Sequence, residues 1–254
     1  MFYFLIAPVL MYNWFLIVAA IIPAVFLMIK VYKSDRLEKE SPYMLGSMVK
    51  AGILSSLIAL VVEFIGQFLL NALVPQTSPA YNVLLYFGLV AFAEEGAKFY
   101  MLKRSSWHNR EFNCQYDGVV YAVFVSLGFA LWENISYVMR YGFSTALVRA
   151  VTAIPGHACF GVFMGVFYGL ARGYAFVGEK TKSKSMRIFC VVVPAFIHGA
   201  YDYIASMNNS NSNLFFLIFI AVMFCVSFVL VRRMSNNDHY FRMDRYHWDF
   251  EILN

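Results

Sequence analysis

A chain of 254 residues with 61% hydrophobic and only 14% charged residues is too apolar for a soluble globular domain, in which about a quarter of the residues are charged. The formal net charge of +5 lies almost wholly in a few loops and forms no basic stripe with stacking aromatic residues, so nucleic acid is excluded as a partner. The composition predicts an integral membrane protein surrounded by lipid.

Seven apolar stretches are each long enough to cross a bilayer, which requires about 20 helical residues. The predicted helices cover residues 8–30, 51–73, 81–103, 117–140, 149–172, 187–206 and 213–231. The sequence therefore predicts an all-α, polytopic membrane helix bundle with about seven transmembrane helices. We expect one bundle over residues 1–234 and a polar C-terminal tail over residues 235–254.

Basic residues in the loops predict the orientation of this bundle. The loops after the first, third and fifth predicted helices are rich in Lys and Arg, whereas loops 74–80 and 207–212 contain neither, and 141–148 has none between Arg140 and Arg149. Because basic loops stay in the cytoplasm, the N-terminus is predicted outside and the C-terminus inside.

The cysteines are scattered along the chain without any CxxC pair, at positions 114, 159, 190 and 225. This pattern predicts neither a disulfide framework nor a thiolate zinc site. We expect the cysteines to pack as small apolar side chains.

Polar residues interrupt four of the predicted spans. An ionisable group at the centre of a membrane helix costs about 2.5 to 3.5 kcal/mol, so such groups indicate a functional site or a paired network inside the bundle. The residues concerned are Glu94, Glu95, Lys98, Glu133, Asn134, His157, His198 and Asp202.

The spacing of these residues predicts that they converge. Lys98 follows Glu94 and Glu95 by four and three positions, and Asp202 follows His198 by four, so each set shares one helix face. His157 begins a series that repeats every four residues with Gly161, Gly165, Gly169 and Gly173. Glycines at this spacing allow a neighbouring helix to approach closely. Counted along the helices, the cluster is predicted to open toward the external side.

Four patterns occur in a fixed order: EEGAK (94–98), FALWEN (129–134), HACFG (157–161) and HGAYD (198–202). In this order the chain resembles the PrsW family of bacterial intramembrane proteases, which are related to the CAAX-processing and bacteriocin-immunity membrane proteases. The resemblance covers all seven predicted helices and leaves only the polar tail unplaced.

The resemblance implies hydrolysis of a peptide bond in a single-span, membrane-anchored protein, typically an anti-sigma factor cut near the extracytoplasmic side. It also implies a multi-pass protein of the bacterial cytoplasmic membrane.

Amide hydrolysis needs a base for water, donors for the oxyanion and an acid for the leaving amine. Glu95 or Glu133 is the expected base. His157 and His198 are expected to orient water or stabilise the oxyanion, and Asp202 to fix the tautomer of His198. Glu94 is assigned mainly to pairing with Lys98, and Asn134 is a supporting residue.

A metal is the open question of this site. Four carboxylates face only Lys98 within the predicted spans, so either a cation or protonation must neutralise them. Zinc commonly takes His nitrogen and Glu oxygen ligands, and the candidates are Glu95, Glu133, His157 and His198. The related CAAX enzymes resemble glutamate-dependent proteases, so glutamate-dependent and zinc-dependent chemistry both remain open.

One polar stripe lies outside the four patterns, at Glu63, Gln67 and Asn71 of the second predicted helix. It either lines a route for water and substrate or joins this helix to its neighbours through hydrogen bonds, and the second explanation is preferred.

Two other functions are alternatives to a protease. An ion or proton-coupled transporter would use the same residues, although the chain lacks the inverted repeat that many transporters show. A scaffold that only binds membrane partners would have no reason to keep the acids and histidines.

Overall fold

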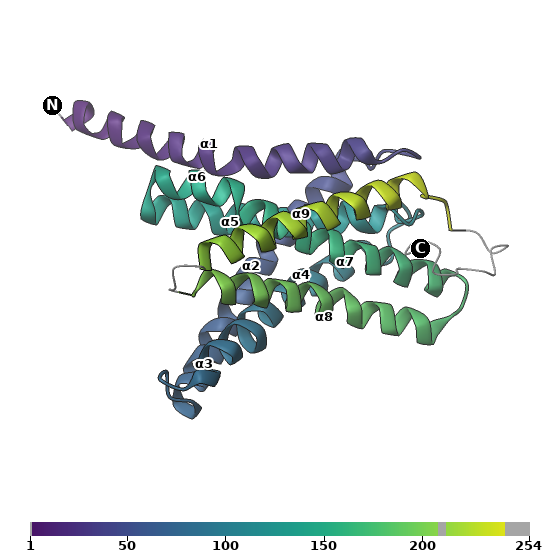
Figure 1. Cartoon of the computed structure of the whole chain (residues 1–254). Helices are drawn as coiled ribbons and strands as arrows, with labels where there is room; N and C mark the ends of the chain where they lie inside the picture. Colours follow the sequence, from purple (N-terminus) through teal and green to yellow (C-terminus); the bar gives the residue numbers. More distant parts are fainter. Residues whose placement is uncertain (1, 208–211, 242–254) are drawn as a thin grey trace.

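The computed structural model describes residues 2–207 and 212–241, and this part of the chain is helical, with one isolated β-bridge and no strand (Figure 1). The all-α prediction is confirmed. The elements are α1 (Phe2–Ser34), α2 (Pro42–Leu73), α3 (Pro79–Val83), the π-helical η1 (Leu84–Val90), α4 (Ala91–Ser106), α5 (Asp117–Tyr141), α6 (Phe143–Val151), α7 (Ala153–Phe176), α8 (Lys180–Ala205) and α9 (Ser212–Asn236).

Six helical segments are long and apolar enough to cross a membrane: Asn13–Ser34, Pro42–Leu73, Asp117–Tyr141, Phe143–Phe176, Lys180–Ala205 and Ser212–Asn236. The predicted span 81–103 is a further segment, in which α3, η1 and α4 follow one another directly. Its polarity comes from the charged residues of α4. With it, the structure has the predicted bundle of about seven membrane helices.

Several predicted helix ends are wrong. α2 begins at Pro42 rather than 51, and α8 begins at Lys180 rather than 187. The predicted ends follow the apolar runs, and these helices continue beyond the apolar run into polar turns outside the hydrocarbon. At α2 the extra turns are stabilised by Ser41, whose Oγ accepts a hydrogen bond from the Met44 backbone N–H at 3.1 Å. The predicted span 149–172 is interrupted at Thr152, between α6 and α7.

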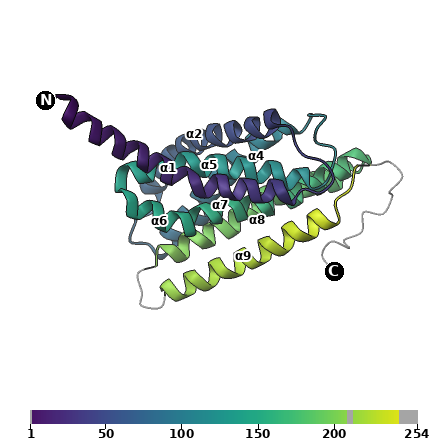
Figure 2. The same cartoon turned by 90° about the horizontal axis from the view of Figure 1, so that it is seen from above.

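Helices α5 and α7 form the centre of the bundle, and the glycine series on α7 lies against α5. A Cβ atom at Gly165 would lie 2.5 Å from Val119 Cα, and one at Gly161 would lie 2.9 Å from Val123 Cα. The predicted close helix approach is confirmed, since no side chain fits at these positions. In Figure 2, α2 lies at one edge of the bundle and α9 at the other, with α5 and α7 between them.

The loops predicted to be cytoplasmic meet at one end of the bundle. We call residues 35–41, 107–116 and 237–241 the loop cap. Within it, the backbone N–H of Tyr116 donates to Asp238 at 2.8 Å, and Ser41 Oγ donates to Glu111 at 3.0 Å. The predicted tail, 235–254, begins inside the last turn of α9, and its residues 242–254 lie outside the described part of the chain.

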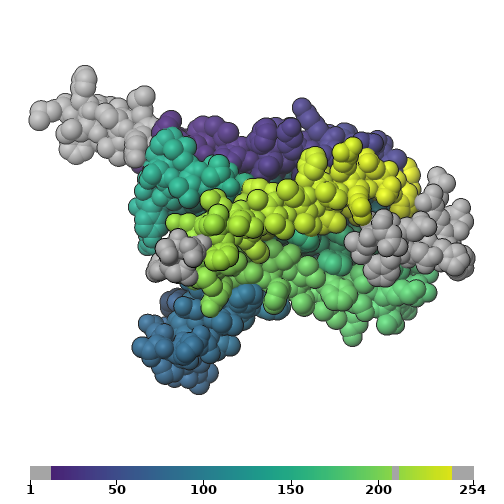
Figure 3. Space-filling view, viewed as in Figure 1, coloured from purple at the N-terminus to yellow at the C-terminus, as the bar shows by residue number. Residues whose placement is uncertain are grey.

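The second half of α2, together with α3 and η1 (residues 60–90), leans away from the other helices, and we call it the α2–η1 arm (Figures 1 and 3). Its outer side chains are strongly exposed, for example Phe64, Phe68 and Leu73 at 77%, 71% and 80%. In a membrane these apolar side chains face lipid. The arm forms one wall of the cavity described below.

All four cysteines are free. Cys114, Cys159 and Cys190 are buried, and Cys225 is exposed on α9. The expectation that the cysteines pack as small apolar side chains holds for the three buried ones.

Candidate active site

A cavity of about 700 Å³ lies between the α2–η1 arm and helices α5 to α8. It occupies the half of the bundle that is farther from the loop cap, because its lining includes both sides of the α6–α7 break and the last turn of α8. Apolar side chains form most of its wall. Its ionisable lining residues are Glu63, Glu94, Glu133, Arg149, His157, His198 and Asp202.

Lys98 is the centre of the polar cluster beside this cavity. Its Nζ lies 3.1 Å from Glu94 Oε2, 2.7 Å from Glu95 Oε1 and 3.2 Å from His157 Nδ1. The same ammonium lies 4.0 Å from the centroid of the Phe129 ring, whose face attracts cations. The side chains of Lys98 and Glu95 are 0% exposed. Burial of these charges is therefore compensated by direct pairing.

His157 links the lysine to the next carboxylate. An ammonium has only N–H donors, so Nδ1 of His157 accepts from Lys98. The Nε2 atom then carries the hydrogen and donates to Glu133 Oε2 at 2.8 Å. The contacts assign this tautomer to His157. One chain of contacts thus joins α4, α7 and α5.

Glu133 has a second partner, the cation Arg149, that the sequence did not indicate as part of the site. Arg149 Nη2 forms an ion pair with Glu133 Oε2 at 3.1 Å, and Arg149 Nε donates to Asn134 Oδ1 at 2.9 Å. The guanidinium carbon lies 4.1 Å from the centroid of Tyr137. Asn134 therefore points away from the cavity and also donates to the backbone of Ala20 at 2.9 Å.

One signal could have identified Arg149. It lies in a segment next to a loop with few basic residues, where the rule that basic loops are cytoplasmic gives no reason for an arginine. Its pairing with Glu133 supplies the reason.

His198 lies between two acids. Its Nδ1 atom is 3.0 Å from Glu95 Oε1, and its Nε2 atom is 3.4 Å from Asp202 Oδ2. Both ring nitrogens therefore face carboxylate oxygens, an arrangement that favours the imidazolium form. Its ring also stacks on Phe160, with centroids 4.6 Å apart.

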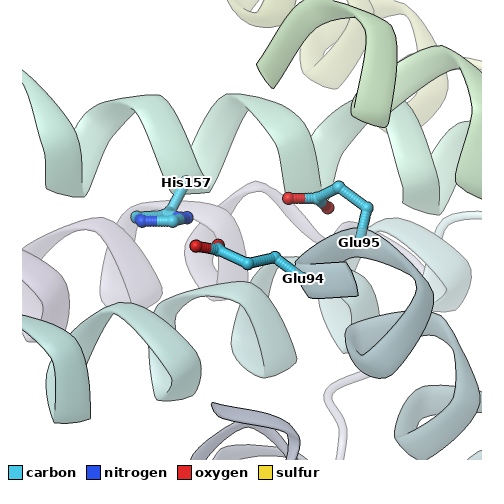
Figure 4. Close-up of side chains that lie close together, drawn as sticks. All are labelled: Glu94, Glu95 and His157. Carbon is cyan, nitrogen blue, oxygen red and sulfur yellow. The ribbon is translucent and has the colours of Figure 1, made fainter. Parts of the chain in front are cut away.

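The two adjacent glutamates differ in exposure to the cavity. Glu94 lines it, whereas Glu95 is enclosed by Lys98 and His198. Figure 4 shows both carboxylates and His157 directed into the space between α4 and α7. The expected pairing of Glu94 with Lys98 is present, but Glu95 makes the shorter contact with Lys98, and Glu94 is the one open to the cavity.

The donor atoms in this cluster are of the kind that zinc binds. One oxygen each of Glu94 and Glu95 and a nitrogen of His157 lie within 4.8 Å of one another, and Glu95 Oε2 is buried without a hydrogen-bond partner. Carboxylate oxygen and imidazole nitrogen are typical zinc ligands. This set differs from the predicted one, since Glu133 and His198 lie outside it. The Lys98 ammonium contacts the same three side chains, so it is the alternative cation for them.

The polar stripe on α2 divides between its two explanations. Glu63 lines the cavity, and within the described residues it has no hydrogen bond or ion pair. Asn71, in contrast, accepts a hydrogen bond from the Tyr81 hydroxyl at 2.6 Å and joins α2 to α3. The preferred structural explanation therefore holds for Asn71, whereas Glu63 lines the cavity and leaves the other explanation open for that residue.

Comparisons with known proteins identify relatives along most of the chain. A family model described as PrsW family intramembrane metalloprotease matches residues 40–231. Protease PrsW of Bacillus subtilis is 32% identical over 81% of this chain and 90% of its own length. Protease PrsW of Geobacillus kaustophilus is 34% identical over 74% of this chain and 79% of its own, and that of Halalkalibacterium halodurans is 30% identical over 88% and 98%. No solved structure matches the chain.

The match extends over all four patterns and the helices that carry them. The apolar spans and the bacterial relatives identify a multi-pass protein of the bacterial cytoplasmic membrane. The chain belongs to the PrsW family of intramembrane proteases.

Proposed function

We propose that the protein is an endopeptidase that hydrolyses a peptide bond of a single-span membrane protein near the extracytoplasmic side, with an anti-sigma factor as its substrate. The observation that carries this proposal is the cavity, in which Glu94, Glu133, His157 and Arg149 face one space inside the bundle. Family membership supports a protease rather than the transporter considered from the sequence.

The side of cleavage is inferred from charge. The loop cap contains the basic loops that we assign to the cytoplasm, and the cavity lies in the opposite half of the bundle. A peptide bond in this cavity would be nearer to the external face. The α2–η1 arm, whose outer side chains are apolar and exposed, forms one wall of this cavity, which suits a substrate that is itself a membrane helix.

Glu94 is the proposed general base. Its Oε2 is bound by Lys98, and no described side chain binds its Oε1, which leaves this oxygen for a water molecule in the cavity. Glu94 takes a proton from the attacking water, and the water oxygen bonds to the carbonyl carbon. The same proton then passes to the leaving amine as the C–N bond breaks. Glu133 is less suited, because its Oε2 already accepts from His157 and pairs with Arg149.

Arg149 is proposed to stabilise the negative charge that develops on the carbonyl oxygen, while His157 donates its one N–H to Glu133 and orients that carboxylate. Fixed donors in a site that excludes bulk water are effective because they need no reorganisation during the reaction. Lys98 keeps the acids paired, and Asp202 holds His198 against Glu95. Lys98 and Asp202 thus hold the side chains of the site in position before the substrate enters.

Zinc, if bound, would be held by Glu94, Glu95 and His157. The ion would supply Lewis-acid polarisation of the carbonyl and a more acidic water. Because zinc and the Lys98 ammonium would compensate the same carboxylates, the metal content of the active protein decides between zinc-dependent and glutamate-dependent hydrolysis. Metal analysis of a purified, cleaving preparation and a chelator titration measure this. Full cleavage by metal-free protein would remove zinc from the mechanism.

The function itself is tested by co-expression with candidate single-span regulators, scored by cleavage. We expect cleavage by the parent chain and loss of cleavage with Glu94→Gln, Glu133→Gln, His157→Ala and His198→Ala. The matched control is Glu179→Gln, which removes an exposed acid outside the cavity. Unchanged cleavage with Glu94→Gln would exclude it as the base. Unchanged cleavage with all four variants would overturn the assignment of the site.

A further inference from the structure

A second group of buried acids lies at the other end of the bundle, in and next to the loop cap. Asp35 follows the end of α1, Glu40 precedes α2, and Asp117 begins α5. Each offers an oxygen atom within 4.8 Å of the others. The three residues are only 4%, 3% and 1% exposed. Segments far apart in the sequence are therefore folded so that three carboxylates meet out of contact with water.

The three acids are not compensated in the way that Glu94 and Glu95 are. Within residues 2–207 and 212–241, no Lys or Arg forms an ion pair with any of them. The nearby ammonium of Lys39 donates instead to backbone carbonyl oxygens, those of Tyr32 and Asp35. Buried carboxylates without a cation are very costly, so the fold leaves a negative charge here that a ligand can neutralise.

Each acid also keeps one buried oxygen that has no hydrogen-bond partner in the described structure: Asp35 Oδ2, Glu40 Oε1 and Asp117 Oδ1. The other oxygens of two of them are held in place. Tyr121 Oη donates to Glu40 Oε2, and the backbone N–H of Cys114 donates to Asp117 Oδ2 at 2.7 Å. The carboxylates are thus oriented by the protein, while one acceptor on each remains unused.

From this geometry we propose that Asp35, Glu40 and Asp117 bind one divalent cation of the hard class, which joins α1, α2 and α5 at the loop cap. All the donors are oxygen, as Ca²⁺, Mg²⁺ and Mn²⁺ prefer. Ligands about 2.3 to 2.6 Å from Ca²⁺ lie at most about 5 Å apart, and one oxygen of each acid lies within 4.8 Å of the others. Mg²⁺ would draw the ligands closer.

A shared proton is the competing explanation. One proton can bridge two carboxylate oxygens, but it leaves the third acid with an unpartnered buried oxygen. A cation engages all three oxygens at once. The site uses none of the residues assigned to hydrolysis, so it stands or fails independently of the proposed protease function.

The test uses the purified full chain in detergent, freed of metal with EDTA and then given Ca²⁺, Mg²⁺ or Mn²⁺. We expect at least one cation to raise the midpoint of thermal unfolding by about 5 °C at a saturating concentration. Asp35→Asn and Glu40→Gln should each abolish the shift, since they keep the shape and remove the charge. The control Glu38→Gln removes a partly buried acid of the same loop, which accepts hydrogen bonds from Asn113 and Tyr240, and should keep the shift.

Terbium luminescence gives a second measurement that does not require stable variants. Tb³⁺ is a hard cation, and Tyr121, in contact with Glu40, would sensitise its emission. We expect emission from the parent chain that Ca²⁺ displaces, and the same emission from Glu95→Gln, in which the other acidic cluster is changed. Absence of both a thermal shift and displaceable emission in the parent chain would overturn the proposal. A shift retained in Asp35→Asn and Glu40→Gln would do so as well.

Discussion

A single ammonium determines the electrostatics of the candidate active site. Lys98 contacts both glutamates of α4 and the imidazole of α7, and an aromatic face covers it. Its four contacts replace the water that a lysine would otherwise keep. Lys98 is therefore the cation that both acids of α4 share, and His198 adds a second contact to Glu95.

Lys98→Met should destabilise the protein by about 3 to 5 kcal/mol, because it leaves two buried carboxylates without their cation. Chemical or thermal unfolding of the purified protein measures the loss. The double variant Lys98→Met with Glu95→Gln removes one of the uncompensated charges and should recover part of the stability. Equal stability of the single and double variants would mean that the charges of Lys98 and Glu95 do not contribute jointly to stability.

Arg149→Met should lower cleavage by about 100-fold, since Glu133 would lose the cation that orients it and a small displacement in the site is costly. Arg149→Lys keeps the charge but cannot bind Glu133 and Asn134 together, and should be intermediate. Cleavage of the co-expressed substrate and the amount of folded protein are measured side by side. Full activity of Arg149→Met would remove the arginine from the site.

At the scale of the helices, close packing of α5 and α7 positions His157 opposite Glu133. The glycine series permits this because the backbone of each helix occupies the volume where side chains would stand. The fold class, the span containing each motif and the approach of α7 to a neighbour could be predicted from apolar runs and four-residue spacing.

The remainder depends on features that these patterns do not contain. The helical break at Thr152 separates Arg149 from His157, and its sequence signal is Pro155, which has no backbone N–H, rather than any interruption of the apolar run. The rotation of α4 about its own axis determines whether Glu94 or Glu95 faces the cavity. The sequence does not show this rotation, because both glutamates belong to the same pattern. The roles of Arg149 and Glu94 therefore required coordinates.

Gly165→Ala should destabilise the protein by about 1 to 3 kcal/mol, because its Cβ would lie 2.5 Å from Val119 Cα and force the two helices apart. Unfolding of the purified variant measures this. Gly46→Ala on α2 is the matched control, since a Cβ there meets nothing within 4 Å. Similar stability of both variants would contradict the close approach of α5 and α7.

The whole molecule has a different polar network at each end. The cavity lies in one half of the bundle. In the other half, the loop cap joins the end of α1, the start of α2, the α4–α5 loop and the end of α9 through hydrogen bonds. The last described residues are part of this cap, since Phe241 N–H donates to the Asn113 carbonyl at 2.9 Å and the Phe241 ring contacts Phe112. The C-terminal segment therefore contributes to the fold.

Burial raises the pKa of Asp238 in the cap to about 6. The folded protein then binds a proton more readily than the unfolded chain, so this group increases stability as the pH falls from 7 toward 4. Asp238→Asn should show a smaller gain between pH 7 and pH 5 than the parent chain, measured by thermal unfolding in EDTA. An identical pH dependence in both proteins would exclude a contribution from Asp238.

The π-helical segment Leu84–Val90 immediately precedes α4. An α-helix turns by about 100° per residue, so one residue more or less in this segment would rotate every later side chain of α4 by that angle. The direction in which the two glutamates point is thus set by this seven-residue segment, of which Tyr86 and Val90 line the cavity. Shortening this stretch by one residue would swing the acids toward lipid while leaving every motif intact.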